Sequence, residues 1–387
     1  MLRFTRMSKK PKTPKILFTG GGTAGHIFPI ITITREIRRL GLDAAFFYLG
    51  PEDVFSSMLL SQEDIKVKTI LAGKIRRYWT WQSILQNMVD ILFKVPLGFF
   101  QSFFHVFFLA PDFIFSKGGY GSLAPVLSGW ILQIPIFLHE SDVTPGLANR
   151  FLSRFSSQVF VAFPVAQTEY FSAKKIVSVG NPIRREILTG SVTEAKKLFR
   201  LQGDKPVILI LGGSQGAQKI NDMILAILPE ILASFELIHQ TGEKNFKQVK
   251  AEAEVVMSQE LEKYYHPIGF LKEIELREAL KAADLVVSRA GSGSIFEMAA
   301  CQKPSILIPL SISAQNHQVK NAYAYAENGA SLVMEEANLT PHFFLEKVKY
   351  LFSYPEELEK MRKGAKEFSQ PESAKTLAQY IVDYLTK

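Results

Sequence analysis

Two glycine-rich segments, each directly after an apolar run, constrain the fold of this chain more than any other feature. The first is Gly20-Gly21-Gly22-Thr23-Ala24-Gly25-His26, and the second is Gly212-Gly213-Ser214-Gln215-Gly216-Ala217. A strand that turns through glycines into a helix directs free backbone N–H groups and the positive end of a helix dipole to one point. Two such turns predict two similar α/β domains that face each other across a cleft and hold anionic ligands between them.

Length and charge narrow the class of protein further. A chain of 387 residues is long enough for two domains, and its single cysteine, Cys301, excludes an internal disulfide. The net charge is +8, and residues 1–180 hold 20 Lys/Arg against 11 Asp/Glu, whereas residues 181–387 hold 25 against 26. This asymmetry predicts that the first half contacts an anionic surface, either a membrane or a nucleic acid.

Apolar runs alternate with helical patterns along the chain, which favours βαβ units and parallel sheets. We expect a basic, poorly ordered leader over residues 1–14, a first domain over residues 15–180 and a second domain over residues 181–370. Asn181-Pro182 sets the boundary, because a residue before proline favours extended chain. A helix within residues 371–387 could pack on either domain. Strands are expected near residues 15–19, 44–49, 113–116, 135–139, 158–162 and 176–179, and near 206–211, 236–240, 284–288, 305–309 and 331–334.

Residues 75–109 depart from this pattern. The run at 91–109 carries seven phenylalanines and approaches the ~20 residues that cross a membrane. Lys94 and Pro96 interrupt it, and a span would break an otherwise complete domain. Two interpretations stay open for this run: a buried helix pair with one exposed face, or a surface that docks on a membrane. The docking interpretation, favoured for the aromatic residues before the run, places these side chains at the headgroup level: Arg76, Arg77, Tyr78, Trp79, Trp81 and Lys94.

Each glycine segment also matches another motif when taken alone. Residues 20–25 could bind NAD, with Glu52 or Asp53 on the ribose. Gly212-Gly213-Ser214-Gln215-Gly216 contains the Gly-x-Ser-x-Gly pattern of α/β-hydrolases, with Asp284 and His317 later in the right order. The NAD alternative leaves residues 212–217 without a role. The hydrolase alternative requires a single sheet, whereas here its motif begins a second domain.

A third segment, residues 289–298, enters a helix directly after the apolar run 284–288. Ser294 and Glu297 have the spacing of a capping box, so Glu297 could cap its own helix. Alternatively, Glu297 could bind a ribose diol while the start of the helix faces a diphosphate. The residues alone leave both interpretations open.

Taken together, the motifs resemble those of the MurG family, peripheral N-acetylglucosaminyltransferases that complete the lipid-linked peptidoglycan precursor. They occur in the family's order over about residues 15–335. The matching segments are Gly-Gly-x-x-Gly-His at 21–26, Lys117-Gly118-Gly119-Tyr120, His139-Glu140-Ser141-Asp142, Pro145-Gly146-Leu147-Ala148-Asn149, Gly180-Asn181-Pro182-Ile183-Arg184, residues 212–217 and residues 289–297.

The resemblance implies the GT-B architecture, two Rossmann-like domains, and transfer of GlcNAc from UDP-GlcNAc to the C4 hydroxyl of MurNAc in lipid I. By resemblance, Glu297 takes the ribose hydroxyls, and Gly293 and Ser294 meet the diphosphate. The remaining donor contacts implied are Arg184, Ser214, Gln215, Phe270, Leu271, His317 and Gln318. The acceptor's diphosphate would meet Gly21, Gly22, Thr23, Ala24, Gly25, Gly119, Tyr120 and Asn149.

Inverting transfer requires one general base for the acceptor hydroxyl. We expect His26, with Glu140 and Asp142 as the other candidates; many family members carry His-Glu-Gln-Asn where this chain has Ser141 and Asp142. The chain contains no Asp-x-Asp, so no metal and no cofactor are expected.

The partners implied are UDP-GlcNAc, lipid I and anionic lipids on the cytoplasmic face of the membrane, with no nucleic acid. A UDP-GlcNAc epimerase, a glycolipid synthase and a non-catalytic nucleotide-sugar-binding subunit are the alternatives.

Overall fold

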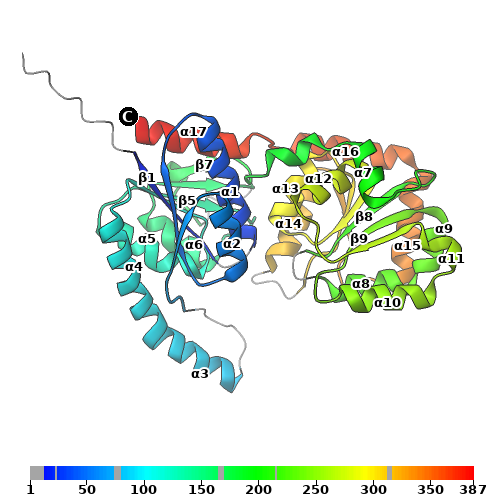
Figure 1. Cartoon of the computed structure of the whole chain (residues 1–387), viewed down its shortest axis with the longest axis horizontal. Coiled ribbons are helices and arrows are strands. Elements are labelled where there is room, and N and C mark those ends of the chain that lie inside the picture. The colour runs from blue at the N-terminus through cyan, green and yellow to red at the C-terminus, as the bar shows by residue number, and fades with distance from the viewer. Residues whose placement is uncertain (1–12, 22–23, 74–79, 164–169, 214–215, 312–315) are drawn as a thin grey trace, which may run out of the picture.

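The computed structural model describes residues 13–21, 24–73, 80–163, 170–213, 216–311 and 316–387. These residues form two α/β lobes that lie side by side, each built on one parallel sheet (Figure 1). A long helix projects from the first lobe, labelled α3 and α4 in Figure 1. The predicted fold class, α/β with two parallel sheets, is confirmed.

Seven strands form the first sheet, in the order β3-β2-β1-β4-β5-β6-β7. They are β1 (Lys15–Thr19), β2 (Ala45–Gly50), β3 (Lys66–Thr69), β4 (Phe113–Ser116), β5 (Ile136–Glu140), β6 (Gln158–Val161) and β7 (Ile176–Ser178). The sequence pattern predicted all of these except β3. Its sequence, Lys-Val-Lys-Thr, is polar because an edge strand buries little, and its lysines discourage pairing with another chain.

Six strands form the second sheet, in the order β10-β9-β8-β11-β12-β13. They are β8 (Val207–Leu211), β9 (Glu236–Gln240), β10 (Tyr265–Ile268), β11 (Leu285–Ser288), β12 (Ser305–Leu307) and β13 (Ser331–Val333). The sequence pattern did not predict β10, because this strand contains Pro267. Proline is tolerated in an edge strand, where its missing N–H is not needed for pairing.

Both sheets reverse their strand order at one place, between β1 and β4 in the first and between β8 and β11 in the second. Ligands of open α/β sheets bind beyond the carboxyl ends of the strands at such a reversal. The two glycine-rich segments follow β1 and β8, so they occupy equivalent positions in the two lobes.

Helices cover both faces of the first sheet. On one face lie α1 (Ala24–Arg39), α2 (Val54–Gln62) and the C-terminal α17 (Ser373–Thr386), which share one apolar cluster with the strands. On the other face lie α4 (Val95–Leu109), α5 (Leu123–Ile131) and α6 (Leu147–Leu152). Three short turns lie in the connections to the strands: η2 (Tyr120–Ser122) before α5, η3 (Ser153–Phe155) after α6, and η5 (Ala173–Lys175) before β7. The last helix therefore packs on the first lobe, although it follows the second in sequence (Figure 1).

The second sheet is covered in the same way. One face carries α7 (Val192–Phe199), α12 (Glu273–Ala282), α13 (Ser292–Ala300) and α14 (His317–Ala326). The other carries α8 (Gln218–Ala226), α9 (Leu228–Ser234), α10 (Phe246–Val256), α11 (Gln259–Glu262) and α15 (Pro341–Ser353). The helix α16 (Pro355–Phe368) contributes to both clusters. Residues 179–184 form the crossover between lobes, and η6 (Arg185–Thr189) follows it.

The projecting helix runs from Trp81 to Leu109 through α3 (Trp81–Val89), a π-helical turn η1 (Asp90–Lys94) and α4. Its few buried residues are mostly small or polar, whereas most of its large exposed residues are apolar. The buried residues are Ser83, Asp90, Gly98, Ser102 and Val106; the exposed ones include Leu85, Leu92, Phe93, Phe100, Phe104, Phe107 and Phe108. A surface helix of a water-soluble domain has the opposite arrangement.

Of the described helices, this one alone is long and apolar enough to cross a membrane by length and composition, with 17% of its most apolar window buried. The sequence left open a buried helix pair with one exposed face for this run. That interpretation is wrong, because the run belongs to a single, largely exposed helix.

Candidate active site

The two lobes meet at the loop that follows β5. Ser292 at the start of α13 donates its hydroxyl to the Ser141 carbonyl at 2.6 Å, and Asn321 in α14 accepts from the Val143 N–H at 2.9 Å. The Asn321 amide also donates to Asp142 Oδ1 at 2.8 Å. The carboxyl end of a central strand of the first sheet therefore contacts the helices that follow β11 and β12 of the second.

Arg184 and Glu297, both predicted donor contacts, form an ion pair at this junction. The Arg184 Nη2 and Nε atoms donate to Glu297 Oε1 at 2.7 and 3.1 Å. The side chains are only 7% and 16% exposed, and the guanidinium carbon of Arg184 lies 4.6 Å from the centre of the Phe28 ring in α1 of the first lobe. Arg184 thus contacts both lobes through a charge pair and a cation–π contact.

The first turn of α13 is open to a ligand. The helix begins at Ser292 after Gly291, which provides no side-chain cap, and a methyl group added at Gly291 or Gly293 would meet nothing within 4 Å. An anion can therefore approach the helix N-terminus closely. The capping-box interpretation is wrong, because Ser294 lies inside the helix and Glu297 accepts from Arg184 instead.

The other described donor candidates lie in α14 and in the loop after β10 of the second lobe. Gln318 Oε1 accepts from the Leu310 N–H at 3.0 Å, beside the half-buried His317 that begins α14. The Phe270 ring lies edge-on to Phe55 of the first lobe, with 6.4 Å between ring centres. Ser214 and Gln215 lie outside the described residues.

Gln240, which sequence reasoning missed, connects two donor segments. Its side-chain oxygen accepts from the Leu271 N–H at 3.2 Å, and its Nε2 donates to the Gly213 carbonyl at 3.0 Å. The N–H group of Leu271, one of the implied donor contacts, is therefore held by a side chain from the end of β9. Only the position of Gln240 at the carboxyl end of a predicted strand could have indicated it.

In the first lobe, two glycines make room for the His26 ring. A methyl group at Gly21 would lie 3.1 Å from Cε1, and one at Gly119, where φ is +80°, would lie 3.1 Å from Nε2. Burial, and secondly the Lys117 ammonium, lower the pKa of His26 to about 4. The imidazole is therefore neutral at pH 7. Ala24 and Gly25 open the helix that carries it, whereas Gly22 and Thr23 lie outside the described residues.

Glu140, the last residue of β5, is held from three directions. It accepts from the Asp142 N–H at 2.9 Å, the Gly146 N–H at 3.1 Å and Asn149 Nδ2 at 2.7 Å. Burial, and secondly the neighbouring Asp142, raise the pKa of Glu140. Both carboxyl oxygens thus shape the loop between β5 and α6. Asn149, expected at the acceptor's diphosphate, takes part in that loop, and the half-buried Tyr120 begins η2.

Lys117 is a buried hub that was not among the predicted site residues. Its Nζ lies 2.6 Å from His139 Nδ1 and 3.4 Å from Asn181 Oδ1, and it also bonds to the Ser141 hydroxyl. Because His139 Nε2 contacts the Gly180 carbonyl at 3.0 Å, Nδ1 is the nitrogen that accepts from lysine. Burial lowers the pKa of Lys117. The hub connects the ends of β4 and β5 to the crossover between lobes.

The residues that could complete a hydrolase or an NAD motif lie elsewhere or make other contacts. Asp284 accepts from the Val207 N–H at 2.9 Å at the amino end of the second sheet, whereas His317 follows the carboxyl end of β12. A hydrolase triad between opposite ends of a sheet is impossible. Asp53, one of the two acids considered for the ribose, caps α2 by accepting from the Ser56 N–H at 2.9 Å.

Of the predicted membrane-facing residues, Trp81 and Lys94 lie in the described part of the chain. Trp81 begins α3 and is 87% exposed. Lys94, expected at the headgroup level beside the phenylalanines, has its Nζ 2.7 Å from the buried Asp90 carboxylate, which offsets its charge. Arg76, Arg77, Tyr78 and Trp79 lie outside the described residues.

Comparisons with known proteins identify the family of both lobes. Residues 16–161 match the glycosyltransferase family 28 N-terminal domain, and residues 207–377 match the C-terminal domain of the same family. A UDP-N-acetylglucosamine--N-acetylmuramyl-(pentapeptide) pyrophosphoryl-undecaprenol N-acetylglucosamine transferase of Clostridium tetani is 36% identical over 96% of this chain and 98% of its own length. The enzyme of the same name from Clostridium botulinum strain Hall is 37% identical over 87% of this chain and 91% of its own.

Solved structures share the fold. Acinetobacter baumannii MurG has a TM-score of 0.71 and 23% identity, covering 96% of this chain and 99% of its own. A UDP-GlcNAc 2-epimerase from Neisseria meningitidis has a TM-score of 0.63 and 16% identity, covering 95% and 100%.

The two matched sheets, with the loops after β5, β11 and β12 in contact, define a glycosyltransferase of the GT-B architecture. Both halves of glycosyltransferase family 28 are present in one chain. The chain belongs to the MurG family, as its identity to the two clostridial enzymes over nearly their full length requires.

Proposed function

We propose that this protein is an inverting hexosyltransferase that moves GlcNAc from UDP-GlcNAc to the C4 hydroxyl of MurNAc in lipid I, forming lipid II. The names of the clostridial relatives support the substrates. The observation that carries the proposal is the open first turn of α13 beside the Arg184–Glu297 pair. It provides a site for a diphosphate and a ribose at the contact between the lobes.

The second lobe binds the donor. The diphosphate accepts hydrogen bonds at Gly293 and Ser294, where the helix dipole favours negative charge. The Glu297 carboxylate accepts from the ribose hydroxyls, and Arg184 remains close enough to stabilise the charge that grows on the leaving diphosphate. Gln318 and His317 contact the sugar, and Phe270 and Leu271 border the uracil.

The first lobe binds the acceptor and takes its proton. The segment 20–25 and Gly119 meet the acceptor's diphosphate, and His26 accepts the proton of the C4 hydroxyl. A neutral imidazole is the form that can accept a proton, and the lowered pKa of His26 keeps it in that form. Glu140 positions the loop after β5, and Asp142 joins that loop to Asn321 of the second lobe.

The enzyme works as a peripheral protein on the cytoplasmic face of the membrane. The exposed apolar side of Trp81–Leu109 supports this proposal, because the acceptor's lipid tail stays in the bilayer. The excess of cations in residues 1–180 favours anionic lipids.

Incubation of the purified protein with UDP-GlcNAc and a short-chain lipid I analogue tests the proposal. We expect release of UDP and a disaccharide product only when both substrates are present. UDP release together with a C2-epimerised sugar, without any acceptor, would instead make the protein an epimerase, whose fold this chain shares.

A further inference from the structure

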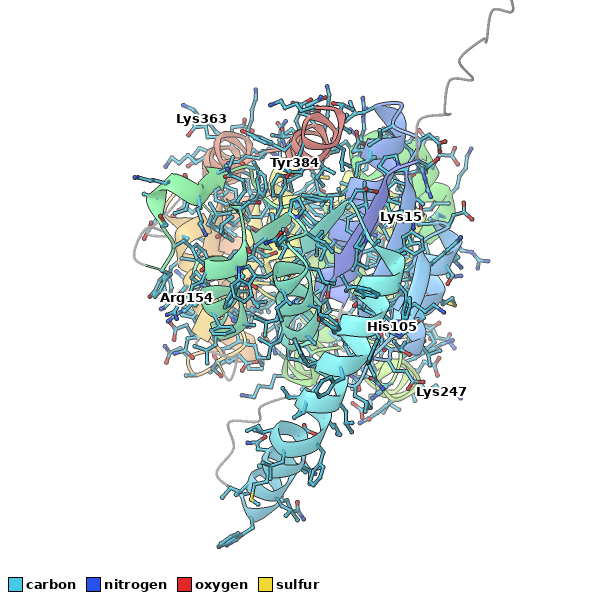
Figure 2. All side chains as sticks on the ribbon, turned by 90° about the vertical axis from the view of Figure 1, so that its left-hand side faces the viewer. Lys15, His105, Arg154, Lys247, Lys363 and Tyr384 are labelled. Carbon is cyan, nitrogen blue, oxygen red and sulfur yellow. The ribbon has the colours of Figure 1, made fainter. Side chains whose placement is uncertain are left out.

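A second feature of the first lobe is a groove between α4 and the edge of the first sheet. It has a volume of about 240 Å³ and is lined by Leu17, Phe47, Leu49, Lys68, His105 and Phe108 among others. The helix residues form one wall, and β2 and β3 form the other. Figure 2 shows His105 on the side of the lobe along which the projecting helix runs. The groove has far less volume than a whole phospholipid and suits a segment of one chain.

The groove combines an apolar floor with a cationic rim. Phe47 pairs in register with Lys66, and Leu49 with Lys68, so these four side chains lie on the same face of the sheet. The Lys66 ammonium lies 5.7 Å from the centre of the Phe47 ring, and both lysines are exposed. Among the described residues that line the groove, none carries a carboxylate. The charge therefore favours an anionic ligand.

The groove is continuous with the apolar side of the projecting helix. Phe108 lines it and stacks on Phe104, with 6.5 Å between ring centres, and both rings are exposed. The groove's volume of about 240 Å³ is many times the ~10–15 Å³ that one water molecule needs in a cavity. An acyl chain segment fits this space, and its phosphate would reach the rim lysines.

We infer that this groove binds one acyl chain of an anionic phospholipid, with its phosphate on Lys66 and Lys68. The inference rests on the proposed docking of this lobe on a membrane and adds a specific lipid site to it. Lys66 and Lys68 lie in β3, the edge strand of the first sheet, and neither is among the residues proposed for donor or acceptor binding. The bound lipid would fix the orientation of the lobe on the bilayer.

Calorimetric titration with dihexanoylphosphatidylglycerol below its micelle concentration tests the site without vesicles. We expect saturable binding at one site and much weaker binding of dihexanoylphosphatidylcholine. Lys68→Glu should weaken the anionic lipid about tenfold, because it replaces an attractive charge by a repulsive one. Lys174→Glu makes the same charge change on an exposed residue of the same lobe, outside the groove, and should change binding less than twofold. Equal effects of the two substitutions, or equal binding of the two lipids, would overturn the inference.

A photoactivatable group on the acyl chain locates the site. Labelling should fall on residues 105–109 and 47–49. Labelling confined to residues 81–97 would place the lipid on the outer side of the helix and would overturn the groove. A short prenyl diphosphate that displaces the phospholipid at lower concentration would assign the groove to the acceptor's tail and would equally overturn the inference.

A failure of the lipid-binding inference can be distinguished from a failure of the proposed transferase activity. A protein that transfers GlcNAc to a soluble acceptor analogue but binds no phosphatidylglycerol refutes the groove alone. One that binds phosphatidylglycerol in the groove but transfers no sugar supports the groove and refutes the transferase.

Discussion

The Arg184 guanidinium lies 2.7 Å from the Glu297 carboxylate and 4.6 Å from the centre of the Phe28 ring. Arg184 is the last residue of the crossover between lobes, Glu297 lies in α13 of the second lobe, and Phe28 lies in α1 of the first. The carboxylate proposed to bind the ribose is therefore already paired with a cation that also contacts the other lobe. Donor binding at Glu297 and the contact between the lobes are physically connected through this arginine.

Because Glu297 pairs with Arg184, its replacement by alanine and its replacement by glutamine should have different effects on stability and donor binding. Glu297→Ala leaves Arg184 without its acceptor and should cost ~1.5–3 kcal/mol of folding stability. Glu297→Gln keeps an acceptor oxygen for Arg184 but loses the charge for the ribose hydroxyls. We expect the glutamine variant to melt near the parent and to bind UDP about tenfold more weakly, as measured by thermal unfolding and calorimetry.

Glu278 provides the matched control for this prediction. It is a buried glutamate of the same lobe, paired with Arg277 and accepting from the Ser191 N–H at 2.7 Å, outside the proposed donor site. Glu278→Gln should affect the melting temperature without changing UDP affinity. If Glu297→Gln also leaves UDP affinity unchanged, Glu297 is only a structural partner of Arg184.

The pH dependence of transfer identifies the base. A base with a pKa of about 4 is active above that value, so kcat/KM should stay constant from neutral pH down to about 5 and fall below it. His26→Ala should lower turnover by ~10²–10⁴-fold with little change in UDP affinity. Glu140→Gln should retain the same fall of kcat/KM at acidic pH, which is the acidic limb of the pH profile. A limb near neutrality that disappears in Glu140→Gln would assign the base to the carboxylate instead.

Lys117→Met should move that acidic limb to higher pH. The Lys117 ammonium disfavours the imidazolium of His26, so its removal raises the pKa of His26. An NMR titration of the His26 ring gives the same quantity without turnover. Lys174→Met, which removes an exposed lysine of the same lobe, should move neither value. A limb that moves to lower pH in Lys117→Met would show that the two groups do not interact as proposed.

Asp142→Asn should be mild, within about threefold of the parent in kcat. The asparagine oxygen can still accept from Asn321 Nδ2, as Asp142 Oδ1 does at 2.8 Å. Asp142→Ala removes this contact between the lobes and should cost ~1 kcal/mol. Kinetics and thermal unfolding measure the two effects. A folded but inactive Asp142→Asn variant would make Asp142 the base.

The sequence predicts the parts of this fold that depend on local pattern. Buried central strands such as Val207–Leu211 are continuous apolar runs, and the glycine turns mark the loops that follow them. The edge strands are the exception, since Lys66–Thr69 is polar and Tyr265–Ile268 contains a proline. Their pairing depends on neighbours that are distant in the sequence.

The site is less predictable, because its contacts join segments far apart in the chain. The pattern Ser294-x-x-Glu297 has the same appearance whether the glutamate caps a helix or pairs with Arg184, which lies 113 residues away. Lys117 and Gln240 follow or end predicted strands, yet no local pattern indicates their partners. The sequence alone does not show that Lys94 is paired. In the helix, its partner Asp90 lies one turn before it.

The last prediction concerns the projecting helix, whose end extends beyond the body of the lobe in Figure 2. Trp81, Leu92 and Phe93 are each at least 60% exposed, so changing them to serine should leave the melting temperature near that of the parent. Burial of such side chains in a membrane contributes ~25 cal/mol per Å² and resists salt, whereas attraction of basic residues to anionic lipids is screened by salt. The triple variant should therefore lose the part of vesicle binding that persists at high salt and lose transfer to vesicle-bound acceptor, while UDP affinity is kept. The control Val255→Ser with Ile274→Ser removes exposed apolar side chains of the second lobe and should sediment with anionic vesicles like the parent. If the triple variant also sediments like the parent at high salt, or if only detergent releases the parent from membranes as for a spanning protein, then peripheral docking through this helix is refuted.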